Sequence, residues 1–153
     1  MLTLSTRGRY ATRILCFLAA QPAGEPISKQ AIAESEDITP DYIEQILTPL
    51  REAGLVQSHR GRHGGFTLAV PPDRLTVAQI LEATDGPLVP VPCLGSEACA
   101  REDGCPTRRV WAEAADAMRT VFQRTTIADL DVPDAGQVQQ APAEKAKSDE
   151  GVE

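Results

Sequence analysis

The sequence predicts a mostly α-helical protein with a small β-wing, organised as a winged helix-turn-helix domain followed by a long dimerisation helix. Three observations predict it. Three amphipathic helical patterns precede residue 55, two short alternating patterns flank the glycine-rich segment 60–65, and one long helical pattern begins near residue 107. Helices followed by a β-hairpin in this order are typical of winged helix-turn-helix domains.

The first helix is predicted over residues 3–20. Tyr10, Ile14 and Leu18 recur at four-residue spacing, which places them on one face of a helix. A proline-containing turn ends the pattern. Cys16 falls within this apolar helix, and we expect it to act as a small buried hydrophobic residue rather than as a ligand.

A helix-turn-helix pair is predicted from a short helix over residues 28–34 and a second helix that begins at Thr39. Thr39 is a good N-cap, and Pro40 suits the first helical position. Gly54 ends this second helix. Pro49 within it removes one backbone hydrogen bond and crowds the preceding turn, so we expect a kink there.

The wing is predicted from two short stretches, 55–58 and 66–70, in which apolar and polar residues alternate. The segment between them, Arg-Gly-Arg-His-Gly-Gly at 60–65, is a glycine-rich hairpin tip. The predicted helix starts in the chain are marked by Ser and Thr side chains that can cap them. These residues are Ser5 or Thr6, Ser28, Thr39, Thr76 and Thr126.

Two further helices follow the wing. One begins with the capping box Thr76-Val-Ala-Gln and runs through Ala83. The other covers residues 107–124 and carries a narrow apolar stripe, which usually indicates a partner helix. We expect this stripe to form a dimer interface, and the alternative is that it docks on its own domain. The stripe consists of Trp111, Ala115, Met118 and Phe122.

The charge of the chain is unevenly distributed. Its 153 residues contain 15 Lys and Arg against 22 Asp and Glu, a net charge of −7. Residues 1–75 are balanced, with eight bases and eight acids, so the excess of acid lies beyond them. Two stretches of the balanced part, 1–24 and 53–72, contain no acid but hold Arg, and such local basic patches can bind phosphate.

We expect a cytosolic protein with no membrane partner. The apolar run at 14–20 is far shorter than the roughly 20 residues of a membrane helix. The N-terminal residues lack the order of a secretory signal. In a reducing compartment, the four Cys favour metal or redox chemistry over structural disulfides.

The helix that begins at Thr39 is the candidate recognition helix. Its early outward side chains include Gln, which pairs well with adenine, Glu, which accepts from cytosine, and Tyr, which reaches phosphate. On the wing, glycine lets the backbone approach phosphates, and Arg can enter the minor groove. The candidate DNA-binding residues are Arg7, Arg9, Thr39, Asp41, Tyr42, Glu44, Gln45, Arg60, Arg62, His63 and Gly64.

Cys93, Cys99 and Cys105 form a C-x5-C-x5-C pattern in a loop without periodicity. Zinc sites usually use Cys pairs two to four residues apart, so the pattern is a poor zinc template. An evenly spaced triple can wrap a polynuclear iron cluster, which prefers thiolate ligands. Spacing alone leaves three alternatives open: a cluster, a loose zinc site and a thiol switch.

An enzyme with a loop cysteine as nucleophile is disfavoured. Such catalysis needs a positioned base. The two histidines of the chain, His59 and His63, both fall in the wing, far along the chain from the loop thiols. We therefore expect a binding protein rather than a catalyst.

Several ordered motifs resemble the Rrf2 family of bacterial transcription regulators, in particular its iron–sulfur, IscR-like branch. The resemblance covers about residues 2–130. It is carried by Leu4-Ser-Thr-Arg-Gly-Arg-Tyr-Ala11, by Tyr42-Ile-Glu-Gln-Ile-Leu47, by Leu50-Arg-Glu-Ala-Gly-Leu-Val56, by Arg60-Gly-Arg-His-Gly-Gly-Phe66, and by the three spaced Cys followed by Trp111.

The resemblance implies a homodimer that binds palindromic operators in double-stranded DNA. It also implies a [2Fe-2S] or [4Fe-4S] cluster held by the three loop cysteines. IscR-like members place a His ligand three residues after the last Cys, and Arg108 stands there in this chain. The fourth ligand is thus open, and the loop carboxylates that could serve are Glu97, Glu102 and Asp103.

These patterns divide the chain into four parts. They are a winged helix-turn-helix DNA-binding domain at 1–86, a cysteine-rich cluster-binding loop at 87–106, a dimerisation helix at 107–130, and a disordered acidic tail at 131–153. We expect the whole to be a regulator, and specifically a repressor, that senses iron, redox or nitric oxide state. The alternative is a DNA-binding regulator whose loop holds structural zinc or acts as a thiol switch, without a cluster.

Overall fold

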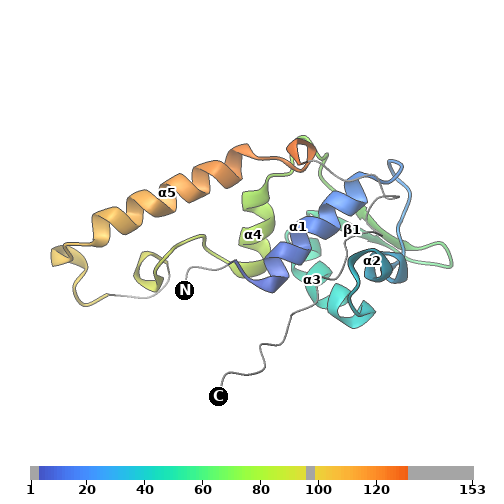
Figure 1. The fold of residues 1–153 in the computed structure, drawn as a ribbon. Helices are drawn as coiled ribbons and strands as arrows, with labels where there is room; N and C mark the ends of the chain where they lie inside the picture. The colour runs from blue at the N-terminus through green and yellow to red at the C-terminus, as the bar shows by residue number, and fades with distance from the viewer. Residues whose placement is uncertain (1–3, 96–98, 131–153) are drawn as a thin grey trace, which may run out of the picture.

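The computed structural model describes residues 4–95 and 99–130, and it has the predicted mostly helical architecture (Figure 1). The predicted acidic tail at 131–153 lies outside the described residues. The elements are α1 (Thr6–Ala19), α2 (Lys29–Glu36), α3 (Pro40–Glu52), β1 (Val56–His59), β2 (Gly65–Leu68), α4 (Val77–Asp85), η1 (Pro92–Leu94), η2 (Glu102–Gly104), α5 (Arg108–Arg124) and η3 (Ile127–Asp129).

The helix starts follow the predicted caps. The side chains of Ser5, Ser28 and Thr39 each accept a backbone N–H of the first turn of α1, α2 and α3. Thr76 and Gln79 form the predicted capping box of α4. Local residue chemistry therefore fixes where these helices begin, although α1 is shorter than the predicted 3–20 and α2 ends two residues later than predicted.

Helix α3 runs through Pro49 as one element and ends where Gly54 adopts φ +72°. The missing N–H of Pro49 does not terminate the helix. The inner face of α3 is packed in the core through Ile46 and Leu50, which are fully buried and lie before and after Pro49. Packing on this face offsets the loss of one backbone hydrogen bond.

The wing is an antiparallel pair in which Val56 is opposite Leu68 and His59 is opposite Gly65. Each strand is four residues long and shifted slightly from the predicted bounds. The chain before α2 adds a bridge, because Ile27 and Phe66 exchange both backbone hydrogen bonds, at 3.0 and 2.8 Å. A Cβ at Gly65 would lie 2.3 Å from the Ile27 carbonyl oxygen, so this close approach requires glycine.

One apolar core joins α1, α2, α3 and the wing. It is dominated by fully buried aliphatic side chains such as Ile14, Ile43 and Leu75. Helix α4 packs across α1 at Gly8, where a Cβ would lie 2.7 Å from the Asp85 carboxylate. After α5 the chain returns to this core, and Ile127 of η3 is buried in it. The core holds the helix-turn-helix pair and the wing in fixed relation.

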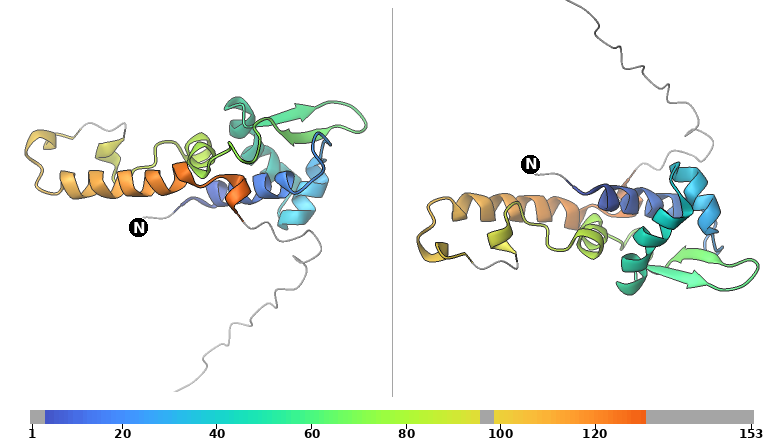
Figure 2. Two further views of the ribbon diagram at one scale, coloured as in Figure 1. Left: turned by 90° about the horizontal axis from the view of Figure 1, so that it is seen from above. Right: turned by 90° about the horizontal axis from the view of Figure 1, so that it is seen from below.

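Helix α5 and the loop before it extend from this body, away from the hairpin, in both views of Figure 2. Part of the stripe predicted to form the dimer interface contacts its own chain. Ala115 is buried, and the partly buried Met118 and Phe122 pack against the α4 cluster of Val77, Ala78, Leu81 and Leu88. Trp111 of the same stripe is 40% exposed, so the use of this stripe in a dimer stays a prediction.

A second apolar stripe of α5, next to the first on the helix surface, is exposed. Val110, Ala114, Ala117 and Val121 are exposed and recur at spacings of four, three and four residues. The loop, for which no regular structure was expected, contains the two short turns η1 and η2. Among the described residues, no helix is long and apolar enough to cross a membrane.

Candidate DNA-binding face and cysteine pocket

The N-terminal half of α3 carries the side chains predicted to contact DNA, and these side chains differ in how exposed they are. Asp41 and Gln45 are exposed, whereas Tyr42 and Glu44 are half-buried. The hydroxyl of Thr39 accepts from the Tyr42 N–H at 3.3 Å, so this residue acts as a cap. Gln45 is therefore the amide side chain of this helix that is best placed for a base edge.

Tyr42 is held by a row of side chains that the sequence alone did not indicate. Its ring packs edge-to-face on Tyr10, with ring centroids 6.0 Å apart and planes at 84°. The Arg13 guanidinium carbon lies 5.4 Å from the centroid of the Tyr10 ring. Arg13 in turn pairs with Glu36, with 2.8 Å between Nε and Oε2. The row links α1 and α2 to the recognition helix, and the three-residue spacing of Tyr10 and Arg13 was its one signal in the sequence.

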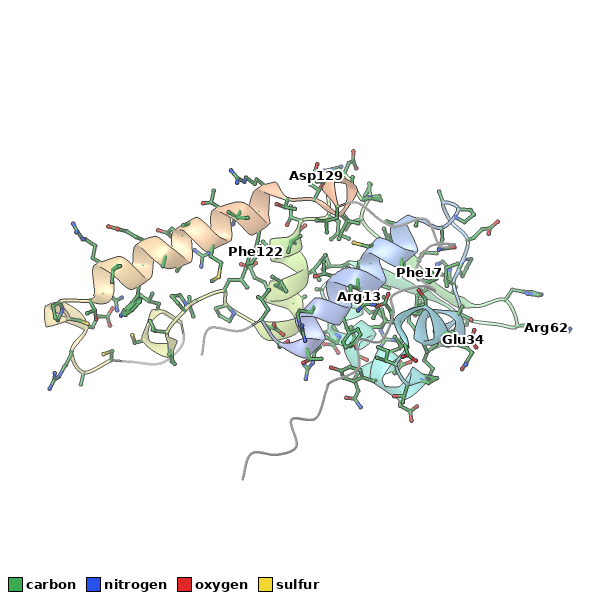
Figure 3. All side chains as sticks on the ribbon, viewed as in Figure 1. Arg13, Phe17, Glu34, Arg62, Phe122 and Asp129 are labelled. Carbon is green, nitrogen blue, oxygen red and sulfur yellow. The ribbon has the colours of Figure 1, made fainter. Side chains whose placement is uncertain are left out.

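Glu36 at the inner end of this row is 7% exposed. Its Oε2 atom accepts no well-aligned hydrogen bond from the described residues, although Arg13 lies beside it. Burial raises the pKa of this carboxyl, and the positive charge of Arg13 opposes that shift. Arg13 projects from α1 and its side chain is more than half exposed (Figure 3).

Glu44 has a partner on the neighbouring helix. Its Oε2 lies 3.6 Å from Nζ of Lys29, which is the first residue of α2. The pair is about half exposed on both sides, so it contributes little to stability. Glu44 is thus positioned by α2 and still accessible from solvent.

The wing tip carries exposed basic side chains. Arg60, Arg62 and His63 are all exposed, and Arg62 extends from the far end of the hairpin (Figure 3). Among the described residues, neither arginine has an ion-pair partner, so both charges remain available to phosphate. The Gly64 N–H donates to the Gly61 carbonyl at 3.0 Å and so closes the turn at the wing tip.

Two further basic side chains, Arg7 and Arg9, are exposed in the first turn of α1. The N-cap of this helix, Ser5, donates from its hydroxyl to Asp85 at the end of α4. The start of α1 is therefore fixed to α4. This arrangement places two positive charges at a defined point on the surface rather than on a free terminus.

The structure brings the three loop cysteines together. Cys93, Cys99 and Cys105 line one cavity of about 90 Å³, although they are spread over thirteen residues of the chain. Its remaining walls come from η1, η2 and the start of α5. They are Val91, Leu94, Glu102, Thr107, Arg108 and Trp111. A larger cavity of about 370 Å³ lies beside the wing between residues 18–25 and 66–72, and it contains none of the predicted site residues.

Charge and hydrogen bonding in the cysteine pocket favour anionic sulfur. The Thr107 side chain and backbone hydrogen-bond Cys105 and lower the pKa of its thiol, with 3.4 Å between Sγ and Oγ1. Arg108 donates to the Cys93 carbonyl at 3.4 Å and to Glu102 Oε1 at 2.7 Å. Arg108, the first residue of α5, therefore links the segment at Cys93 to the turn at Glu102.

Cys16 is in a different environment, because it is partly buried against the core of the winged domain. Burial raises the pKa of its thiol, and the nearby Glu36 carboxylate adds to the shift. Cys16 therefore does not join the pocket of the other three cysteines. The loop carboxylate Glu97 lies outside the described residues.

The donor set of the pocket fits an iron–sulfur cluster better than a single ion. Within residues 4–95 and 99–130, no group of three His, Cys, Asp or Glu side chains is arranged to hold one metal ion. A single zinc ion needs all its ligands within about 2.3 Å, whereas a polynuclear cluster spreads its thiolates around a larger volume. Three thiols around one cavity, beside an arginine, match the second arrangement in residue type and placement.

Comparison with known proteins identifies the chain's relatives. Residues 4–131 match the Rrf2 family, described as iron-dependent transcriptional regulators. The chain is 38% identical over 127 residues to the HTH-type transcriptional regulator CymR of Bacillus subtilis, covering 83% of this chain and 88% of that protein. It is 30% identical over 127 residues to the regulator IscR of Aliivibrio salmonicida, covering 83% and 76%.

Solved structures give the same result. The structure of CymR, the global cysteine regulator of B. subtilis, superposes with a TM-score of 0.71 at 38% identity, covering 84% of this chain and 95% of that one. The T. potens IscR structure superposes with a TM-score of 0.69 at 32% identity, covering 93% and 94%. These relatives are regulators, which confirms that the chain is not an enzyme. The chain belongs to the Rrf2 family of DNA-binding transcriptional regulators, which act as dimers.

Proposed function

We propose that this DNA-binding regulator senses iron, redox or nitric oxide state through an iron–sulfur cluster held by Cys93, Cys99 and Cys105, and that it represses its target genes. The observation that carries the proposal is the convergence of three distant thiols on one cavity. The lowered pKa of the Cys105 thiol supports it, because thiolates are the ligands of such clusters. When bound, a cluster would supply a centre that iron supply, oxidants or nitric oxide can alter. We also propose that it acts in the cytoplasm, where its DNA target lies.

We assign base reading to the exposed start of α3 and phosphate contacts to the wing. Gln45 is the candidate for adenine, and Arg62 at the wing tip is the candidate for the minor groove or its phosphates. In a dimer, the two recognition helices would meet half-sites about 34 Å apart on a palindromic operator. Arg7 and Arg9 at the fixed start of α1 would add phosphate contacts.

This assignment makes separate predictions for the two kinds of residue. Gln45→Ala should relax the preference at one base position, with discrimination falling by about 1–3 kcal/mol. Arg62→Ala should weaken binding to all DNA sequences equally. It should also reduce the slope of log affinity against log salt concentration by about one. The measurement is a salt titration of affinity on duplexes that the protein itself selects from a random pool. Equal effects of both variants on sequence preference would contradict the assignment.

For the dimer contact we propose the exposed face of α5 formed by Val110, Ala114, Ala117 and Val121. These residues recur at coiled-coil spacing, and their small side chains allow two helices to approach closely. Val110 and Val121 are 51% and 44% exposed in the single chain. Because members of the family act as dimers, each chain needs an exposed apolar surface for the contact. This face of α5 provides such a surface.

The path from pocket to DNA runs through α5. The pocket lies at the N-terminal end of α5, while its C-terminal end is tied to the winged domain by the Thr76–Thr126 bridge and by buried Ile127. The wing and the cysteine loop lie at opposite ends of the folded body (Figure 1). A change at the pocket would thus act on the operator by moving α5 and the dimer contact.

The test is the iron, acid-labile sulfide and zinc content of protein purified without oxygen, with a visible spectrum. We expect iron and sulfide in near-equal amounts, and their loss in Cys93→Ala, Cys99→Ala and Cys105→Ala with the dimer intact. Cys16→Ala is the matched control and should keep the cluster. Operator affinity should change about 5–150-fold on cluster loss, the usual range of allosteric coupling.

A second candidate function is a regulator without a cluster, with a thiol switch or structural zinc in the loop. The observation in favour of the thiol switch is that the described residues contain no group arranged to hold a metal ion. Colourless protein after anaerobic cluster reconstitution, with DNA binding that ignores iron and oxygen, would establish this alternative. Zinc alone in stoichiometric amount would favour its structural form.

A further inference from the structure

The cysteine pocket is incomplete as a cluster site, because three thiolates leave one protein ligand unassigned. We propose that Glu102 is the fourth protein ligand and that Arg108 orients its carboxylate toward the pocket. The inference rests on the proposed cluster. It is drawn from the pocket lining and from the contacts of Arg108.

Glu102 is singled out by position. Among the described residues, it is the one carboxylate that lines the cavity together with Cys93, Cys99 and Cys105. Asp103, the next residue, is exposed and does not line it. The turn η2 (Glu102–Gly104) places Glu102 between Cys99 and Cys105, and Cys105 directly follows the turn. The sequence left Glu97, Glu102 and Asp103 as equivalent candidates. The fold separates Glu102, which lines the cavity, from Asp103, which does not.

Arg108 holds Glu102 through one oxygen. Its Nη2 donates to Oε1 at 2.7 Å, while Nη1 donates to the Cys93 carbonyl at 3.4 Å. The planar guanidinium fixes both acceptors relative to each other, which lysine could not do as well. Arg108 contacts the carboxylate at Oε1, and within the described part of the chain Oε2 remains available as a donor atom to iron.

The charges and the chemistry agree with this role. Three thiolates and a carboxylate bring four negative charges to one small cavity, and the Arg108 guanidinium offsets part of them. Glu102 is 53% exposed on its side chain, so the ion pair alone contributes little to stability. Iron accepts oxygen ligands, and a carboxylate leaves iron more readily than a thiolate does. A site with one exchangeable ligand suits a sensor.

The experiment uses the full chain, reconstituted with iron and sulfide under anaerobic conditions without DNA. The variants are Glu102→Gln and Glu102→Cys, with Asp103→Asn as the matched carboxylate control. The readouts are the circular dichroism and electron paramagnetic resonance of the cluster and its rate of iron release to a chelator. Thermal unfolding of each protein checks that the fold is kept.

We expect Glu102→Gln to release iron about 10-fold faster than the native chain, the lower end of ligand-shell effects. Its spectra should change, because the ligand set of one iron changes. Glu102→Cys should keep iron longer than the native chain and show spectra of an all-thiolate cluster. Asp103→Asn should match the native chain in every readout.

Two failures are distinguishable. If the native chain takes up iron and sulfide and Glu102→Gln matches it in spectra and release, the assignment of Glu102 is wrong while the proposed function stands. Equal changes in Glu102→Gln and Asp103→Asn would likewise overturn it, because they would report only the loop charge. If the folded, DNA-binding native chain takes up no cluster, the proposed function and this inference both fail.

Discussion

The winged domain and the cysteine arm, taken as residues 4–86 and 87–124, are built on opposite principles. The first buries a continuous set of aliphatic side chains from α1, α2, α3 and the wing. In α5 the one buried residue is Ala115, and both the loop and the outer face of the helix are open to solvent. The winged domain therefore has its own apolar core, whereas most side chains of the arm are left for a second chain or a ligand to cover.

The same contrast governs the cysteines. The core raises the pKa of the Cys16 thiol through burial and the nearby carboxylate. The arm lowers the pKa of the Cys105 thiol through hydrogen bonds from Thr107. One region therefore keeps sulfur neutral and inert, and the other favours the thiolate that binds metals and reacts.

The largest effect should come from opening the core of the winged domain. Ile46 is fully buried, so Ile46→Ala should lower the free energy of unfolding by about 2–5 kcal/mol. Val110→Ala on the exposed face of α5 should change the free energy of unfolding of the monomeric chain by less than about 0.5 kcal/mol. Denaturant unfolding measures both variants. Similar losses in both would break the contrast between the two regions.

The Arg13–Glu36 pair should give the next largest effect. Arg13→Ala leaves a buried carboxylate without its partner, which should cost about 1–3 kcal/mol at pH 7. Burial raises the folded pKa of Glu36, so the folded state holds this proton more tightly than the unfolded state. The stability from this group is therefore complete below the unfolded pKa and is lost as pH rises through the folded value.

Glu36→Gln checks the sign of that dependence. The glutamine cannot ionise, so its stability relative to the native chain should rise between pH 4 and pH 7. Thermal or urea unfolding at several pH values measures this. A native chain that gains stability over Glu36→Gln as pH rises would show that Arg13 outweighs burial at this site.

The sequence predicted features that depend on neighbouring residues and missed features that depend on packing. The Thr39 cap and the Thr76 capping box are local chemistry, and both are present. Helix α5 has two apolar stripes, and no local rule says which one faces the body. The structure buries the stripe of Met118 and Phe122 because the apolar surface of α4 lies there (Figure 3). Sequence reasoning chose the same stripe for the partner, and that choice stays a prediction because Trp111 of the stripe is exposed.

The candidate site shows the same division. Even spacing indicated that three thiols act together, and they line one cavity. The choice among the loop acids needed the turn η2 and the Arg108 contact, which no spacing reveals. The row from Tyr42 to Glu36 was also out of reach, because it joins three helices and depends on the burial of Glu36. The roles of the DNA-binding residues and the four-part division of the chain stay predictions.

The thiol contrast makes a prediction about rates. In metal-free protein at pH 7 to 8, iodoacetamide should alkylate Cys105 faster than Cys16, because a lower pKa gives more thiolate. Thr107→Val removes the hydrogen bond from the side chain and should slow alkylation at Cys105. Mass spectrometry of digested samples gives the rate at each cysteine. Cys16 serves as the internal reference, and its faster labelling would reverse the assignment.

The smallest effect should come from an ion pair on the arm. Arg109 and Glu113 are one turn apart on α5, with 3.6 Å between their charged atoms, and their side chains are 90% and 67% exposed. Because water solvates both charges, Glu113→Gln should change the free energy of unfolding by less than about 0.5 kcal/mol. Urea unfolding in low and high salt measures it. The Arg13–Glu36 pair has the same kinds of charge at a shorter distance and should differ mainly through burial. A loss at Glu113 as large as that for Arg13→Ala would mean that this face of α5 is covered, and the dimer contact would then extend beyond the stripe from Val110 to Val121.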